Sequence, residues 1–99
     1  MVRQIVRAVG IAWYHRQDYR RILDIMEDAD ILPASYDEWL KGAEAGERQL
    51  KRSGHTVVRA IIDPDEFPAW CRTRSLKIDA EGRVRWANEA AYRHFKGIH

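Results

Sequence analysis

Residues 55–76 are the part of the sequence that most constrains the fold. They begin with a short apolar run, 55–62, whose β-branched residues are typical of a buried strand. Residues 63–66, Asp-Pro-Asp-Glu, then end the strand and begin a helix, because aspartate is a good N-cap and proline suits the first helical turn. Apolar residues follow at helical spacing, namely Phe67, Trp70 and Cys71. We therefore expect a helix over 64–75, with Trp70 at the centre of the core.

The rest of the chain predicts one more strand and three more helices. A strand is expected over 9–14, an amphipathic helix from Tyr19, and a second helix from the capping box at Ser35 to the glycine at position 54. The last helix begins after Asp79, and we expect its inner face to be Val84, Ala87, Ala91 and Phe95. The fold class is therefore α/β and helix-rich, in the order β-α-α-β-α-α, with helices packed on a sheet of two or three short strands.

The two halves of the chain, 1–54 and 55–99, have similar patterns. Residues 11–19 align without gaps against 59–67, and Ser35 corresponds to Asp79. This indicates a pseudo-repeat of two βαα units, although the same pattern also arises by chance in units of this kind. A strand joined to the next strand through helices favours parallel pairing. Two strands leave open edges, which a third strand over 2–6 or a second copy of the chain would cover.

Size and composition indicate one small domain, 1–99. The chain has 99 residues, is 45% hydrophobic and 32% charged, and has a net charge of +2, too small to imply a polyanionic partner. The single cysteine favours a reducing compartment. No apolar run is long enough for a membrane span or a signal peptide. We expect a cytoplasmic protein that does not enter a membrane.

A ligand site is one interpretation of the residues after the two strands. The carboxyl ends of parallel strands lie together, and ligands of α/β sheets usually bind beyond them. The residues there are His15, Arg16, Asp63 and Asp65. A histidine beside an aspartate suits acid–base chemistry, and an arginine suits an anion. The simpler interpretation is that Asp63 and His15 cap helices and that Arg16 is solvated.

The sequence predicts no metal site, no cofactor and no set of catalytic residues. The four histidines are scattered, without the spacing that forms a coordination shell, and no glycine-rich phosphate loop is present. Cys71 has two arginines nearby that would lower its pKa. It also lies on the apolar side of its helix, which indicates a buried and inert thiol.

Basic clusters allow a second interpretation, nucleic-acid binding through contacts to phosphates. The residues concerned are Arg48, Lys51, Arg52, Arg72, Arg74 and Lys77. The sequence has no recognition-helix pattern and no pair of stacking aromatics.

The leading hypothesis is a non-catalytic interaction or regulatory domain that associates with itself. Four tryptophans and four tyrosines exceed what so small a core readily buries, and aromatic side chains are enriched in interfaces. Together with the open sheet edges, they predict a homodimer or a protein partner. Nucleic-acid binding and an anionic-ligand site or small enzyme at the strand ends are the alternatives.

Overall fold

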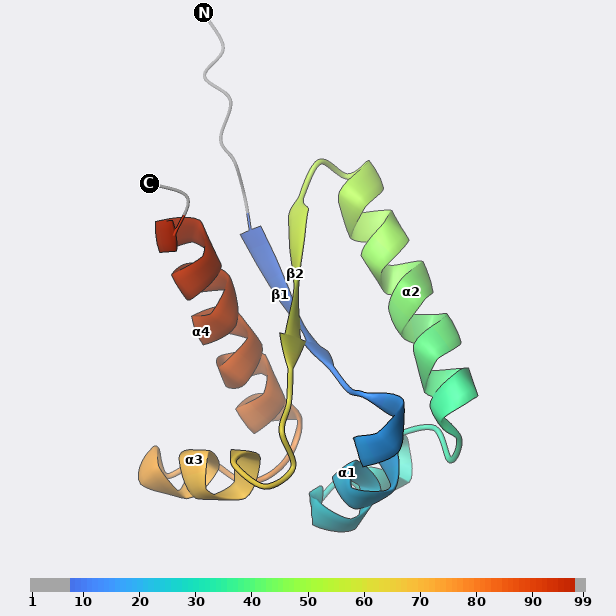
Figure 1. Cartoon of the computed structure of the whole chain (residues 1–99), viewed down its shortest axis with the longest axis vertical. Coiled ribbons are helices and arrows are strands. Elements are labelled where there is room, and N and C mark those ends of the chain that lie inside the picture. Colours follow the sequence, from blue (N-terminus) through green and yellow to red (C-terminus); the bar gives the residue numbers. More distant parts are fainter. Residues whose placement is uncertain (1–7, 98–99) are drawn as a thin grey trace, which may run out of the picture.

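The computed structural model describes residues 8–97, and these form the expected β-α-α-β-α-α order (Figure 1). The elements are β1 (Ala8–Trp13), α1 (Tyr19–Ile25), α2 (Tyr36–Arg52), β2 (Thr56–Ile61), α3 (Phe67–Thr73) and α4 (Ala80–Gly97). Two 3-10 turns, η1 (Arg16–Asp18) and η2 (Ala29–Ile31), flank α1. The predicted third strand over 2–6 lies outside the described residues. Across 8–97, no helix has the length and apolar character needed to cross a membrane.

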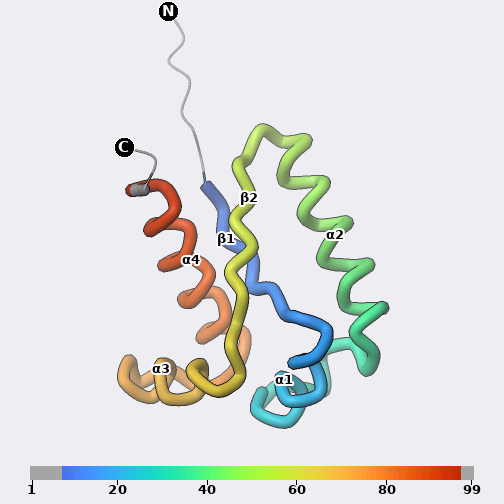
Figure 2. The backbone as a smooth tube through the Cα atoms, in the orientation of Figure 1, coloured from blue at the N-terminus to red at the C-terminus, as the bar shows by residue number. Residues whose placement is uncertain are grey.

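The sheet has two parallel strands, as the sequence predicts. Ala8 pairs with Thr56 and Trp13 with Ile61, and α2 provides the crossover between the strands. The pairing continues one step further, because the Ile62 N–H donates to the Trp13 carbonyl oxygen at 2.9 Å. Figure 2 follows this path, down β1, back up through α2 and down β2. Both strands therefore point toward the end of the molecule that carries α1 and α3.

The two long helices lie on opposite faces of the sheet. Side chains alternate between faces along a strand, so Gly10 and Trp13 face opposite ways. Gly10 lies directly under Ala87 of α4. Trp13 instead meets α2, where its ring centroid is 5.1 Å from that of Trp39 in an edge-to-face arrangement. Helix, sheet and helix thus form three layers (Figure 1).

The two halves have the same order of elements and similar element lengths. Both strands have six residues, and both short helices, α1 and α3, have seven. The strand pairing joins the same residues that the ungapped sequence alignment joins, such as Ile11 with Arg59. Caps also match: Ser35 Oγ accepts the Glu38 N–H at 3.2 Å, and Asp79 Oδ1 accepts the Glu81 N–H at 3.1 Å. The order strand, short helix, long helix therefore occurs twice, but α2 and α4 cover opposite faces of the sheet, so the pseudo-repeat stays a prediction.

The core lies where the strand ends meet the short helices. The largest fully buried side chains are Tyr14, Ile22, Ile62, Phe67 and Cys71. Trp70 is only half-buried and packs against this cluster, so the prediction that it forms the centre is wrong. The reason is the start of α3, which lies at Phe67 and not at position 64. Asp63 Oδ1 first accepts the Asp65 N–H at 2.8 Å in a turn, and this places Phe67 innermost.

The predicted inner face of α4 is also partly wrong. Ala87 and Ala91 are buried, but Val84 is 59% exposed and Phe95 38%. A buried arginine turns the helix away from the expected orientation. Arg83 is 8% exposed and donates to both carboxylate oxygens of Asp28, at 2.7 and 2.9 Å. Because the ion pair satisfies Arg83, the helix can bury this residue and leave Val84 on its flank.

Candidate functional site

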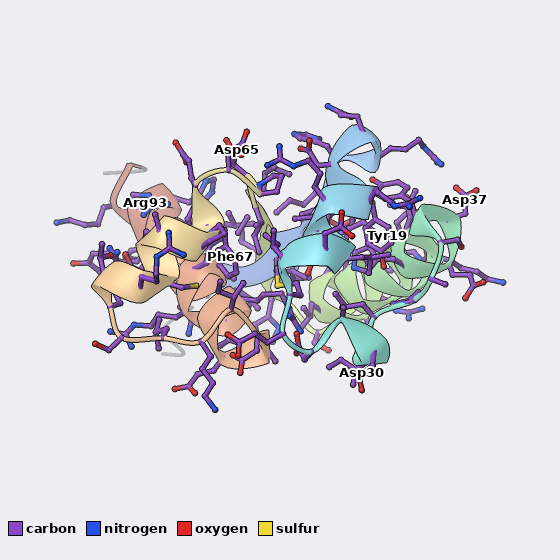
Figure 3. The ribbon with its side chains drawn as sticks, turned by 90° about the horizontal axis from the view of Figure 1, so that it is seen from below. Tyr19, Asp30, Asp37, Asp65, Phe67 and Arg93 are labelled. Atoms are coloured by element: carbon purple, nitrogen blue, oxygen red, sulfur yellow. The ribbon has the colours of Figure 1, made fainter. Side chains whose placement is uncertain are left out.

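The four residues proposed for a ligand site follow the strand ends, but two of them pair with residues outside the proposed site. Arg16 pairs with Asp37 at 2.8 Å and lies 4.6 Å from the ring centroid of Tyr36. Asp65 pairs with Arg21. Figure 3 looks onto this end and shows Asp65 and Asp37 well apart in that view. Both pairs are exposed, and such pairs contribute little to stability.

The histidine and the aspartate at this end form no pair. His15 is exposed and makes no side-chain cap to η1. Asp63 uses a carboxylate oxygen within its own turn. Within residues 8–97, no hydrogen bond or ion pair joins His15 to Asp63. The strand ends thus carry four polar residues without a shared contact. The simpler interpretation fits only in part, because Asp63 bonds within its turn, His15 makes no cap and Arg16 is paired with Asp37.

The two basic clusters lie at opposite ends of the molecule. Arg48, Lys51 and Arg52 belong to the last turns of α2, at the top of Figure 1. The other cluster, Arg72, Arg74 and Lys77, belongs to α3 and the loop after it, at the bottom. Arg74 also lies 3.3 Å from Glu89 and 4.2 Å from the ring centroid of Trp70. The clusters therefore do not form one continuous basic surface.

Cys71 has the surroundings of an inert thiol. Its side chain is fully buried, and burial raises its pKa above the usual value, with Asp79 adding to this effect and Arg74 opposing it. The described residues contain no group of three histidine, cysteine or acidic side chains that could hold a metal ion.

The outer edge of β2 is partly closed by side chains. Neighbouring residues of a parallel strand direct their backbone groups to opposite sides. The Ile62 N–H points to β1, so the backbone groups of Ile61 point outward. There the Trp86 indole N–H donates to the Ile61 carbonyl oxygen at 3.1 Å. A tryptophan from α4 therefore blocks the end of this edge.

Within residues 8–97, the outer edge of β1 has no partner. Because the Trp13 carbonyl points to β2, the backbone groups of Ala8, Gly10 and Ala12 point away from the sheet. Among the described residues, no side chain or backbone group bonds to these three. The edge closes only after the strand, where the Tyr36 hydroxyl donates to the Tyr14 carbonyl oxygen at 2.9 Å. No residue of β1 is charged, and none is proline. Natural edge strands usually carry such residues to prevent pairing.

An apolar groove follows this open edge. Its volume is about 300 Å³, and it is lined by Gly10, Ile11, Ala12, Ala80, Arg83, Val84 and Ala87. A further hollow continues along the same side of α4, lined by Ala8, Asn88, Ala91, Tyr92 and Phe95. Val84 and Tyr92 stand out from the groove, 59% and 63% exposed. We call the outward groups of β1 and this side of α4 the β1–α4 surface.

Sequence reasoning found half of this surface. The sequence predicts open sheet edges and shows that the strand carries no charge. It does not predict the α4 side, because the apolar spacing places Val84 on the inner face. The spacing gives no signal for this side, because Val84 and Ala87 are three residues apart and share one face of an ideal helix.

Comparison of the chain with protein-family models, with curated proteins and with solved structures finds no match.

Proposed function

We propose that this chain is a small, non-catalytic interaction domain that associates with itself through the β1–α4 surface. The observation that carries the proposal is the edge of β1, which is uncharged and has no partner among the described residues, beside exposed apolar side chains of α4. An edge of this kind offers unpaired backbone donors and acceptors to another strand. The adjoining apolar side chains add area that association removes from water.

The contrast between the two edges supports this surface over others. The β2 edge ends under Trp86, and its middle residue, Arg59, is held by Glu47 through two hydrogen bonds of 2.7 and 2.8 Å. Arg59 also lies over the Trp13 ring at 4.0 Å from its centroid. A charged side chain beside the β2 edge makes it a poorer template for strand addition. The β1 edge has no such protection within the described residues.

The two alternatives have less support. Nucleic-acid binding relied on a common basic surface, and the two clusters lie at opposite ends of the molecule. A ligand site at the strand ends relied on contacts between His15 and Asp63, whereas Arg16 and Asp65 each pair with other residues. We place the domain in the cytoplasm, in keeping with a single cysteine that is buried and unpaired.

Sedimentation velocity over a wide concentration range tests the proposal. We expect a reversible dimer whose dissociation constant rises tenfold or more in Val84→Lys, because the substitution places a charge within the apolar surface. The matched control is Ile31→Lys, since Ile31 is 66% exposed and lies on η2. This control should dimerise like the parent. A parent that stays monomeric at high micromolar concentration, or equal effects of the two substitutions, would refute the proposal.

A further inference from the structure

We infer that the second copy binds antiparallel, β1 against β1, with the two-fold axis beside Gly10 and the two α4 helices side by side. This arrangement rests on the proposed self-association and specifies its geometry. It doubles the two-stranded sheet to four strands. Both copies use the same surface, as a two-fold dimer requires.

The backbone of β1 is suited to this pairing. The outward residues Ala8, Gly10 and Ala12 are arranged evenly about Gly10. If Gly10 lies opposite Gly10 of the second copy, then Ala8 lies opposite Ala12, and every outward N–H and carbonyl of these residues has a partner. Shifting the strands leaves some of these groups unpaired. The symmetric register is therefore the one that satisfies the most hydrogen bonds.

The position of α4 leaves room for a second α4. This helix contacts both strands, and Trp86 reaches the outer side of β2. The helix therefore covers both strands, with its closest backbone contact at Gly10 of β1. With each α4 axis centred over its own strand pair, two helices related by an axis between neighbouring β1 strands are separated by about two strand spacings, roughly 9–10 Å. Packed helices are typically 8–10 Å apart.

The side chains on this side of α4 match one another across the same axis. Ala87 lies above Gly10, so the axis passes close to Ala87 and Asn88. Val84 and Tyr92 lie equally far along the helix on either side of Asn88. In an antiparallel pair, Val84 of each copy therefore faces Tyr92 of the other, and the two Asn88 amides meet at the axis. The two most exposed apolar residues of this surface cover each other.

Charge supports the same orientation. Glu81 lies in the first turn of α4 and Lys96 in the last. Antiparallel helices bring Glu81 of one copy near Lys96 of the other, whereas parallel helices bring like charges together. The helix dipoles favour the antiparallel arrangement as well.

Disulfide cross-linking tests the arrangement, with Asn88→Cys as the test variant and Arg93→Cys as its control. Both positions are exposed on α4, but Arg93 lies about 140° around the helix from Asn88, away from the expected axis. Helix axes about 9–10 Å apart bring facing Cα atoms to roughly 5 Å, within the range for a disulfide. The native Cys71 is fully buried. Under mild oxidation, we expect most of the Asn88→Cys protein to form a covalent dimer, and less than a tenth of Arg93→Cys.

Each outcome decides a different claim. A parent that dimerises in sedimentation, with no excess of Asn88→Cys cross-linking over the control, would overturn the antiparallel arrangement and leave self-association in place. A monomeric parent, as expected if another segment of the chain covers the edge, would overturn both.

Discussion

Gly10 of β1 and Ala87 of α4 are packed backbone against backbone. A Cβ atom on Gly10 would lie 2.0 Å from the Ala87 carbonyl oxygen and 2.6 Å from its carbonyl carbon. This contact holds α4 close to the sheet on the side of β1. It also sets which residues of the helix stand beside the open edge.

The Gly10→Ala variant should therefore be strongly destabilised. The clashing atoms belong to the backbone and cannot move aside, so we expect the free energy of unfolding to fall by about 3 kcal/mol or more. Gly46→Ala is the matched control, because nothing lies within 4 Å of a Cβ at that position in α2. Alanine there should stabilise the helix by about 0.5–1 kcal/mol. Urea unfolding measures both, and a Gly10→Ala protein as stable as the parent would show that α4 is docked differently.

Phe67, and not Trp70, should be the more costly residue to truncate. Phe67 is fully buried, whereas Trp70 is half-buried beside Trp86 and Arg74. We expect Phe67→Ala to reduce the free energy of unfolding by about 3–5 kcal/mol, which is enough to unfold a marginal domain. Trp70→Ala should cost less and still melt cooperatively. The reverse order in thermal unfolding would contradict the observed start of α3.

The Asp28–Arg83 pair should give stability that depends on pH. The hydrogen bonds from Arg83 lower the pKa of Asp28 below its usual value. A carboxylate with a depressed pKa in the folded state stabilises the protein above its unfolded pKa, near 3.9, and this stability is lost as the pH falls through the folded pKa. Asp28→Asn should cost about 3 kcal/mol at neutral pH, because it leaves Arg83 buried without a counter-charge.

The control for that variant is Asp24→Asn, an exposed position of α1. Denaturant unfolding between pH 7 and pH 2 measures how the free energy of unfolding falls with pH. This fall should be smaller for Asp28→Asn than for the parent, and for Asp24→Asn it should equal that of the parent. If the free energy of unfolding of the parent and of Asp28→Asn fell equally with pH, the Asp28–Arg83 pair would not be the source of pH-dependent stability.

Cys71 should resist thiol reagents in the folded protein. Its side chain is fully buried, and its pKa is raised by burial. Alkylation should follow the unfolding transition in urea, and the native protein should react at least a hundredfold more slowly than the unfolded chain. Rapid native labelling would indicate that the core around Phe67 opens.

The fold was predictable because its local signals agree with one another. The β-branched run in β2, the capping serine of α2 and the helical spacing after Tyr19 each indicate the element that forms. Parallel pairing followed from the helices between the strands. The burial of Phe67 in place of Trp70 was not predictable from spacing alone. Proline and aspartate suit either a turn or a helix cap, and here the turn at Asp63 delays the start of the helix.

The surface beside β1 was only partly predictable for a physical reason. The pattern of α4 suggests that apolar Val84 faces the sheet and charged Arg83 faces water. The structure has the opposite, because Asp28, distant in the sequence, supplies the counter-charge that makes burial of Arg83 favourable. A single sequence gives no sign of such a long-range pair.

Amide hydrogen exchange, resolved by residue, tests self-association through β1 most directly. The N–H groups of Gly10 and Ala12 point outward, as does that of Arg59 on the other edge of the sheet. Raising the protein concentration through the dimerisation range should slow exchange at Gly10 and Ala12 by tenfold or more, while exchange at Arg59 stays unchanged. If Gly10 and Ala12 exchange as fast as Arg59 at the highest concentration, the edge of β1 is not the surface through which this chain associates.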